Sequence, residues 1–220
     1  MQKGSTQKKA SLQRRGRPAQ QVRIIGGLWK RTPLPVLEAE GLRPTPDRVR
    51  ETLFNWLNHL FDGEWTQLNC LDLFAGTGAL GFEAGSRGAA RVLMVEDNPA
   101  AIRQLEASKA KLNANRMSIQ RGDALTVAQG LAQRVGDASS RFDLIFLDPP
   151  YHHEWLVKIL PVCAQLLRDD GLIYAESEVP LDAQGPTMDW LAGWEVVRAD
   201  KAGMVFFHVL RRNNTAEIQA

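Results

Sequence analysis

Residues 69–81, with the sequence NCLDLFAGTGALG, contain the pattern that decides the fold. Their apolar first half predicts a buried strand that leads into a glycine-rich turn and then into a helix beginning near Ala79. Gly76, Gly78 and Gly81 stand where the turn is expected. Glycine there permits a positive φ and lets a ligand approach the backbone closely. Nucleotide-binding folds of several chemistries share the spacing Gly-x-Gly-x-x-Gly, so the spacing alone predicts no particular reaction.

The acidic residue inside this strand helps to distinguish between the classes of nucleotide-binding fold. Asp72 lies ahead of Gly76 and is separated from the turn by Phe74 and Ala75. A dinucleotide dehydrogenase usually brings its first glycine close behind an uninterrupted apolar strand. The order acid-x-Phe-x-Gly-x-Gly instead resembles motif I of the S-adenosylmethionine (SAM) methyltransferases. That resemblance implies a SAM-binding set formed by Asp72, Phe74, Ala75, Gly76, Thr77, Gly78 and Gly81.

Predicted strands and helices alternate along the chain from residue 69 onward. The expected strands are 69–74, 91–96, 117–121, 142–148 and 171–176, and the expected helices are 79–86, 99–112, 124–134 and 153–168. Such alternation indicates βαβ units and a parallel sheet with helices on both faces. Two more β-rich runs, 194–199 and 204–210, are typical of an antiparallel hairpin. The sequence therefore predicts an α/β, Rossmann-like class I methyltransferase fold, in which an antiparallel C-terminal hairpin closes a mostly parallel seven-stranded sheet.

The part of the chain ahead of this domain is expected to contain a tail and a small extension. Residues 1–21 are polar and basic and predict a disordered tail. Residues 22–45 predict an N-terminal extension in which a short strand after Val22 pairs with 34–37 as a β-hairpin. Thr45 is a candidate N-cap with Pro46 at the first helical position, so a helix opens the domain at 46–212. Residues 213–220 are expected to be a frayed tail.

Composition limits the class of protein. Nine basic residues precede the first acidic residue, Glu38, which leaves 18 basic against 25 acidic residues in the remainder, a net charge of −7. A basic arm on an acidic body favours a polyanionic partner, most commonly nucleic acid.

The chain has no apolar run long enough to span a bilayer and no signal-peptide pattern, so we expect a cytoplasmic protein. Cys70 and Cys163 are expected to be buried thiols, and no cluster of residues predicts a metal site.

Acidic residues recur at the ends of the predicted strands. Asp72, Glu96, Asp123 and Asp148 are each about one strand–helix unit apart, and ligands of doubly wound sheets bind beyond the carboxyl ends of the strands. Glu96 is placed to accept both ribose hydroxyls of a bound nucleotide, and Asp123, followed by Ala124, is placed to accept from an adenine amine. Asp97 and Asp148 join the candidate cofactor set. A structural role for Asp97 and Asn98, capping the helix at Pro99, is the stronger interpretation of that pair.

The segment Asp148-Pro149-Pro150-Tyr151 is the second strong signal. It follows the apolar strand at 142–147, and its prolines supply no N–H, so carbonyl groups there can accept hydrogen bonds. Asp148 and the Pro149 carbonyl can receive both hydrogens of an exocyclic amine while Tyr151 stacks on the attached base. An aromatic amine is a poor nucleophile, and two fixed acceptors orient it and stabilise the positive charge that develops on it. The four residues are therefore the candidate catalytic set.

With these residues in place, the chain resembles the bacterial RsmD family, which methylates the N2 amine of a guanine in 16S ribosomal RNA. The matching segments are 22–27, 41–57, 72–81, 148–151 and Tyr174-Ala-Glu-Ser-Glu178. The glycine motif and the 148–151 motif are common to many amino-methyltransferases, whereas the block at 41–57 is more specific to this family. The resemblance implies that this block, with Thr45, Arg48 and Glu51, packs over the cofactor side.

The resemblance also implies an RNA partner, held within a folded small ribosomal subunit or a late assembly intermediate, with no membrane contact and a monomeric enzyme. The candidate RNA-contacting residues are Arg23, Lys30, Arg31, Arg43 and Arg50. Two alternatives stay open at this point. The 148–151 motif serves adenine-N6 methylation of DNA or RNA equally well, although no separate DNA-recognition domain is visible. The second alternative is a non-catalytic RNA-binding assembly factor that kept the fold. The intact glycine turn disfavours this alternative.

Overall fold

The structure is a computed structural model, and it describes residues 21–36, 46–136, 140–150, 154–181 and 188–213. The predicted N-terminal tail lies outside the described residues, except for Gln21. Of the predicted C-terminal tail only Asn213 is described.

A mixed sheet forms the centre of the molecule. Within the described residues it has seven strands, in the order β5-β4-β3-β6-β7-β9-β8. The strands are β3 (Asn69–Asp72), β4 (Arg91–Glu96), β5 (Met117–Arg121), β6 (Phe142–Leu147), β7 (Leu167–Ser177), β8 (Trp194–Ala202) and β9 (Val205–Arg212). The first five are parallel, and β9 runs antiparallel to both β7 and β8. The predicted parallel sheet with a closing antiparallel hairpin is confirmed.

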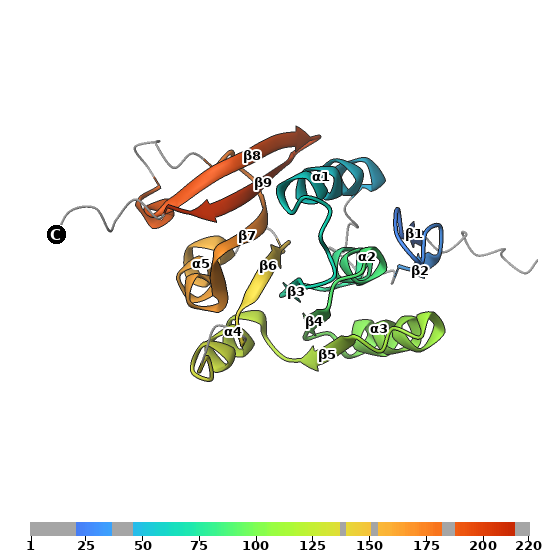
Figure 1. The fold of residues 1–220 in the computed structure, drawn as a ribbon. Helices are drawn as coiled ribbons and strands as arrows, with labels where there is room; N and C mark the ends of the chain where they lie inside the picture. Colours follow the sequence, from blue (N-terminus) through green and yellow to red (C-terminus); the bar gives the residue numbers. More distant parts are fainter. Residues whose placement is uncertain (1–20, 37–45, 137–139, 151–153, 182–187, 214–220) are drawn as a thin grey trace, which may run out of the picture.

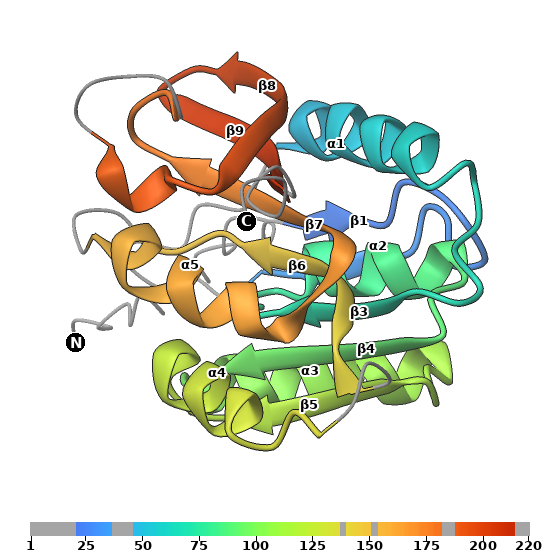
Figure 2. The same ribbon diagram turned by 60° about the vertical axis from the view of Figure 1, so that its left-hand side comes forward.

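Helices cover both faces of this sheet. They are α1 (Asp47–Leu60), α2 (Ala79–Arg87), α3 (Pro99–Leu112), α4 (Ala124–Ala132) and α5 (Trp155–Leu166). Figure 1 shows α1, α2 and α3 on one side of the strands and α4 and α5 on the other, and Figure 2 shows the same layers after a turn. Alternate strand residues enter opposite cores because side chains alternate across a strand. Phe146 packs on the α1–α2 side, whereas Ile145 and Leu147 pack on the α4–α5 side.

Several predicted boundaries differ from the structure, and two of these differences have a clear physical cause. Helix α5, predicted at 153–168, ends at Leu166. Leu167 takes an extended conformation and pairs with Phe142 as the first residue of β7. An uninterrupted apolar run conceals this change from helix to strand. The closing hairpin turns at Gly203 (φ +64°), with Ala202 opposite Val205, so β8 is longer than predicted. At the start of α1 the N-cap residue is Pro46, and Thr45 lies outside the described residues.

The predicted N-terminal hairpin is confirmed as a separate two-stranded sheet. β1 (Gln21–Arg23) pairs antiparallel with β2 (Pro33–Pro35). In Figure 1 the hairpin lies on the outer side of α2, close to α3. The Gln104 side chain of α3 donates a hydrogen bond to the Pro35 carbonyl.

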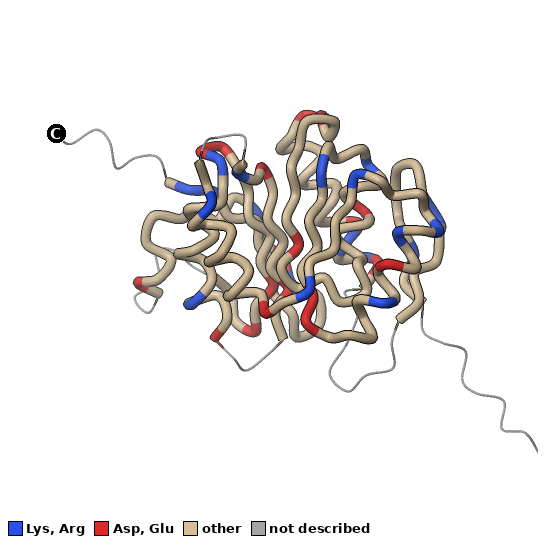
Figure 3. Tube along the Cα trace, turned by 90° about the horizontal axis from the view of Figure 1, so that it is seen from below, with Lys and Arg blue, Asp and Glu red and all other residues tan. Residues whose placement is uncertain are grey.

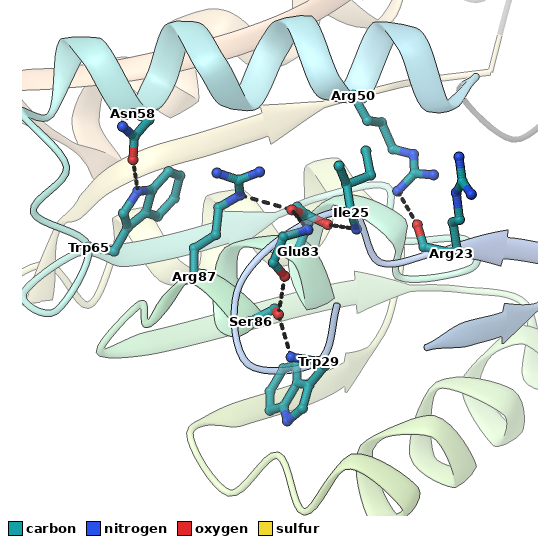
Figure 4. Close-up of polar contacts among 10 residues, drawn as sticks. Arg23, Ile25, Trp29, Arg50, Asn58, Trp65, Glu83, Ser86 and Arg87 are labelled. Atoms are coloured by element: carbon teal, nitrogen blue, oxygen red, sulfur yellow. Dashed lines mark hydrogen bonds and ion pairs between the residues drawn. The ribbon is translucent and has the colours of Figure 1, made fainter. Parts of the chain in front are cut away.

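A buried carboxylate on α2 holds the segment that follows β1. Glu83 is fully buried, and its carboxylate accepts hydrogen bonds from the backbone N–H groups of Ile25 (2.6 Å) and Gly26 (2.9 Å) and from Arg87 Nε (2.8 Å). Ser86 Oγ donates to the Gly26 carbonyl and accepts from the Trp29 N–H. Figure 4 shows these contacts converging on one face of α2. Hydrogen bonds to an ionised group are about twice as strong as neutral ones, so this cluster anchors the extension to the domain.

Gly27 makes the close approach of the extension to α2 possible. It has a φ of +71°, and a Cβ at this position would lie 1.9 Å from the Ser86 carbonyl oxygen. No L side chain fits that gap without moving the backbone.

We therefore expect Gly27→Ala to loosen the docked extension. Gly193→Ala is the matched control, because Gly193 also has a positive φ (+85°) but a Cβ added there would have no atom within 4 Å. The control should cost about 1–2 kcal/mol in the free energy of unfolding, the ordinary cost of a left-handed alanine. Gly27→Ala should cost clearly more and should speed amide hydrogen exchange at residues 25–29. Equal costs in denaturant titrations, with unchanged exchange, would contradict the docking role of Gly27.

Candidate active site

A pocket of about 600 Å³ opens at the carboxyl edge of the parallel strands. Its wall combines the ends of β3, β4, β6 and β7 with the turns that follow them and with the tip of the β8–β9 hairpin. The structure brings most of the predicted site residues together in this wall: Asp72, Phe74, Ala75, Gly76, Thr77, Glu96, Asp97, Asp123, Ala124, Asp148, Pro149 and Pro150. Figure 3 shows acidic segments gathered along the lower edge of the sheet in that view.

The glycine turn adopts the conformation that its sequence predicts. Gly76 (φ +51°) and Gly78 (φ +78°) both take left-handed backbone angles, and Gly78 is the N-cap residue of α2. Gly81 lies behind the turn, where a Cβ would meet Met94 Sδ at 2.7 Å. Gly78 and Gly81 therefore shape the pocket without lining it. The first residues of α2, Ala79 and Leu80, do line it, so the pocket lies at a helix N-terminus, where backbone N–H groups favour negative or electron-rich ligand atoms.

Asp72 is a buried carboxyl in the pocket wall. Only 1% of its surface is exposed, and its Oδ2 accepts a hydrogen bond from the Gly81 N–H at 3.0 Å. Its Oδ1 is buried and has no hydrogen-bond partner among the described residues. Burial raises the pKa of Asp72 to about 7, and the Gly81 N–H acts in the opposite direction. A buried acceptor without a partner is costly, so this oxygen is suited to a donor supplied by a ligand.

Glu96 holds the two turns next to it. Its Oε2 accepts from the Gly76 N–H at 2.7 Å, and its Oε1 accepts from the N–H groups of Asp97 (3.0 Å) and Asn98 (2.9 Å). The same carboxylate thus joins the glycine turn to the start of α3. Its predicted role toward ribose hydroxyls stays a prediction.

Two further polar residues at strand ends cap helices. Asn98 accepts from the N–H groups of Ala100 and Ala101, as expected for the N-cap of α3. Asp123 caps α4, because its Oδ1 accepts from both the N–H and the hydroxyl of Thr126 at 2.8 Å. Asp123 also lines the pocket, so capping fixes the direction of a carboxylate that remains accessible to a ligand.

Asp148, Pro149 and Pro150 follow β6, the neighbour of β3 in the sheet, and line the same pocket as the glycine turn. Tyr151, the last member of the predicted catalytic set, lies outside the described residues. Trp155 opens α5 and lines the same part of the pocket, with its ring centroid 5.3 Å from that of Phe74 in an edge-to-face arrangement. Phe74 belongs to the glycine motif, so this contact connects the two motifs.

Several pocket residues were not predicted from the sequence. They include Val36, Pro46, Trp155, Glu176 and the hairpin tip formed by Ala202, Gly203, Met204 and Val205. Glu176 ends the predicted strand at 171–176, so the rule that pointed to the other strand-end acids also applies to it. Nothing in the local sequence places Val36 or the hairpin tip there, because only tertiary contacts bring them to the pocket.

One predicted RNA-contacting residue was wrong. Arg50 is fully buried; its Nη1 donates to the Arg23 carbonyl at 2.9 Å and its Nη2 lies 2.6 Å from Asp47 Oδ1. Burial lowers the pKa of Arg50, while Asp47 and Glu83 act in the opposite direction. The guanidinium therefore joins α1 to the N-terminal extension and does not reach a phosphate (Figure 4).

The other residues predicted to contact RNA or to lie beside the cofactor differ in where they stand. Arg23, Lys30 and Arg31 are exposed on or beside the N-terminal hairpin. Arg48 lies on the first turn of α1 but is not part of the pocket wall, and Arg43 and Thr45 lie outside the described residues.

Metal-binding and membrane-spanning features are absent from the described part of the chain. It contains no group of three or more His, Cys, Asp or Glu side chains arranged to hold a metal ion. No helix among the described residues is long and apolar enough to cross a membrane. Cys70 and Cys163 are free and buried, as expected from the sequence.

The raised pKa of Asp72 predicts how stability depends on pH. A carboxyl whose pKa is higher in the folded than in the unfolded state stabilises the fold below the unfolded pKa, and this contribution is lost as the pH rises. Relative to Asp72→Asn, whose amide oxygen can still accept from the Gly81 N–H, the unmodified protein should lose stability between about pH 4 and pH 7, by roughly 1.4 kcal/mol for each unit of pKa difference. Urea titrations of both proteins at several pH values measure this difference. A constant difference across the range would show that Asp72 ionises normally.

Comparisons with known proteins agree with this geometry. The family model described as "Conserved hypothetical protein 95" matches residues 22–211. The ribosomal RNA small subunit methyltransferase D of Escherichia coli is 39% identical over 202 residues, covering 91% of this chain and 94% of that protein. The protein of the same name from Haemophilus influenzae is 36% identical, covering 86% and 93%.

Solved structures support the same assignment. A putative methyltransferase of Escherichia coli has a TM-score of 0.71 and 37% identity, and the match covers 88% of this chain and 99% of that one. The chain therefore belongs to the RsmD family and is a SAM-dependent methyltransferase of the class I fold.

Proposed function

We propose that this protein transfers a methyl group from SAM to the exocyclic N2 amine of a guanine in 16S ribosomal RNA. The observation that carries the proposal is that Asp148, Pro149 and Pro150 share one pocket with the glycine turn and Asp72. Methyl acceptor and methyl donor can therefore meet within a single chain. The names of the relatives, which refer to ribosomal RNA of the small subunit, support the choice of substrate.

The residues of the pocket fit the cofactor. SAM offers a positively charged amino group, two ribose hydroxyls and an adenine amine, all of which are donors. The buried Oδ1 of Asp72 has no partner among the described residues, and the carboxylates of Glu96 and Asp123 reach the same pocket. We assign to the cofactor side the motif residues 72–81 together with Glu96, Asp97, Asp123 and Ala124. The resemblance alone, and not the pocket wall, supports adding Thr45 and Arg48.

The chain itself positions the amine. When bound, SAM supplies a methyl group activated by the positive charge on its sulfur. Asp148 and the Pro149 carbonyl accept the two hydrogens of the guanine amine, which points the nitrogen lone pair toward the methyl group. The Asp148 carboxylate also stabilises the positive charge that develops on the nitrogen. Tyr151 stacks on the base. These residues act by orientation and electrostatics, which together reduce the barrier without a covalent enzyme intermediate.

The target base has to leave the RNA stack to reach this pocket. Enzymes that modify a base inside folded nucleic acid extrude it, because the reacting atom is otherwise covered by its neighbours. Arg23, Lys30, Arg31 and Arg43 are proposed to hold phosphates on the N-terminal side of the pocket. The substrate is proposed to be a folded small subunit or late assembly intermediate in the cytoplasm, and the enzyme is proposed to act as a monomer.

Product analysis tests the proposal. Small subunits from a strain that lacks the enzyme should gain one N2-methylguanine per 16S RNA when they are incubated with the protein and labelled SAM, as measured by mass spectrometry of digested nucleosides. N6-methyladenine as the product would replace the proposal by the adenine alternative, and no product with no SAM binding would favour a non-catalytic assembly factor.

Asp148→Ala should abolish this turnover, with a loss of at least about 1,000-fold, because it removes an acceptor that acts on the reacting nitrogen. Its affinity for SAM, measured by calorimetry, should change little, since the cofactor is held mainly by the glycine turn and by Asp72. Full activity of this variant would overturn the catalytic assignment of Asp148.

Charge on the extension should govern RNA affinity. Lys30→Gln combined with Arg31→Gln should weaken binding and reduce the slope of log K against log salt by about two, one for each lost phosphate contact. The matched control is Arg116→Gln with Arg134→Gln, because both arginines are exposed, lie outside the N-terminal extension and carry the same total charge. Filter binding across a salt series measures both slopes. An equal loss in the two double variants would mean that only net charge matters.

A further inference from the structure

A buried carboxylate that takes no part in the proposed transfer step lines the same pocket as Asp148. Glu176 of β7 is only 5% exposed and lines the pocket. β6 and β7 are parallel neighbours, and Leu147 is paired with Ala175. Asp148 and Glu176 therefore occupy matched positions one residue beyond that pair. Matched residues of parallel strands project from the same face of the sheet, and neighbouring strands lie about 4.8 Å apart.

The carboxylate of Glu176 is held by a buried tyrosine. The Tyr174 hydroxyl donates to Glu176 Oε1 at 2.7 Å, and Tyr174 is itself fully buried, with its ring edge-to-face against Phe146. A residue and the one two positions later share a face of a strand, so the phenol can fix the direction of the acid. A carboxylate has about four acceptor positions, so Glu176 can accept a hydrogen bond from a ligand in addition to the one from Tyr174.

We propose that Glu176 determines the specificity for guanine by accepting the N1–H of the target base. This inference rests on the proposed function and deepens it. Guanine carries the N1–H donor and the N2 amine side by side on one edge. With Asp148 and the Pro149 carbonyl on the N2 hydrogens, an acceptor at the adjacent position meets the N1–H. The Asp-Pro-Pro segment recognises only an amine, so it does not by itself distinguish guanine from adenine.

Glu176 supplies that distinction in its ionised form, because an ionised carboxylate is an acceptor only. The N1 atom of adenine is also an acceptor, and two acceptors facing each other in a buried site repel and lose their hydrogen bonds to water. Sites that form a hydrogen bond to one substrate reject an analogue without the donor by large factors, whereas apolar pockets discriminate weakly. A buried carboxylate in this position therefore favours the binding of guanine and disfavours the binding of bases with an unprotonated N1.

The base analogue 2-aminopurine tests this assignment, because it keeps the 2-amine but has an unprotonated N1. Small subunits are reconstituted with 16S RNA that carries guanine or 2-aminopurine at the methylated nucleotide. The unmodified enzyme should prefer guanine in kcat/KM by about 100-fold. In Glu176→Gln the amide keeps an oxygen for the Tyr174 hydroxyl and can present its N–H to the base. The preference for guanine should then fall by about 100-fold, because kcat/KM decreases for guanine and increases for 2-aminopurine.

The matched control is Glu178→Gln. Glu178 lies two residues further along, is exposed and is not part of the pocket wall, yet its replacement changes the net charge equally. Its preference should equal that of the unmodified enzyme. Calorimetry with SAM and thermal unfolding establish that each variant is folded. Tyr174→Phe is the second variant, and freeing the carboxylate should lower the preference by about tenfold, the size of one lost hydrogen bond.

The outcomes separate this inference from the proposed function. If the unmodified enzyme produces no N2-methylguanine, the proposed function fails and the role of Glu176 fails with it. If it does so and Glu176→Gln keeps the full preference for guanine, only the role of Glu176 is overturned. Should Glu176→Gln not fold, an unchanged preference in Tyr174→Phe overturns it instead.

Discussion

The parallel pairing of β3 with β4 and β6, and of β6 with β7, is the constraint on which the site depends. Parallel strands need a crossover between them, here a helix each time, so their carboxyl ends all lie at one edge. Residues far apart in the sequence thereby meet in one pocket, among them Asp72, Glu96, Asp148 and Glu176. A shift of the register by one residue would turn each acid away from the pocket and into an apolar core.

Helix α2 joins this site to the N-terminal extension. Its first residues follow the glycine turn and line the pocket, while its later residues Glu83, Ser86 and Arg87 hold the segment after β1. A buried carboxylate needs compensation, which Glu83 obtains from two backbone N–H groups and a guanidinium. The extension is therefore attached to the same rigid element that shapes the turn. Its residue Val36 reaches the pocket wall, so docking and the shape of the pocket are coupled through α2.

Local pattern was sufficient for much of the fold. The strand–glycine–helix signal at residues 69–81 and the alternation that follows it rest on side-chain periodicity and backbone freedom, which operate over a few residues. The limits of local pattern appear at Leu167, which looks helical in sequence but pairs as a strand. They appear again at Arg50, a charged residue in a basic cluster that resembled a phosphate-binding group. Its burial is possible only because Asp47 and the Arg23 carbonyl meet it in three dimensions.

The sequence by itself determined the reaction class and the positions of the two motifs that carry it, because glycine, proline and strand-end acids act through their own backbone chemistry. Only the tertiary structure decided what surrounds those motifs: the capture of the extension by Glu83, the burial of Arg50, and the arrival of Trp155, Glu176 and the hairpin tip at the pocket. These features depend on contacts between segments distant in the chain. The physical reason is that the burial of a side chain and its hydrogen-bond partners depend on two elements that meet in space. The propensity for helix or strand depends only on a residue and its neighbours in the sequence.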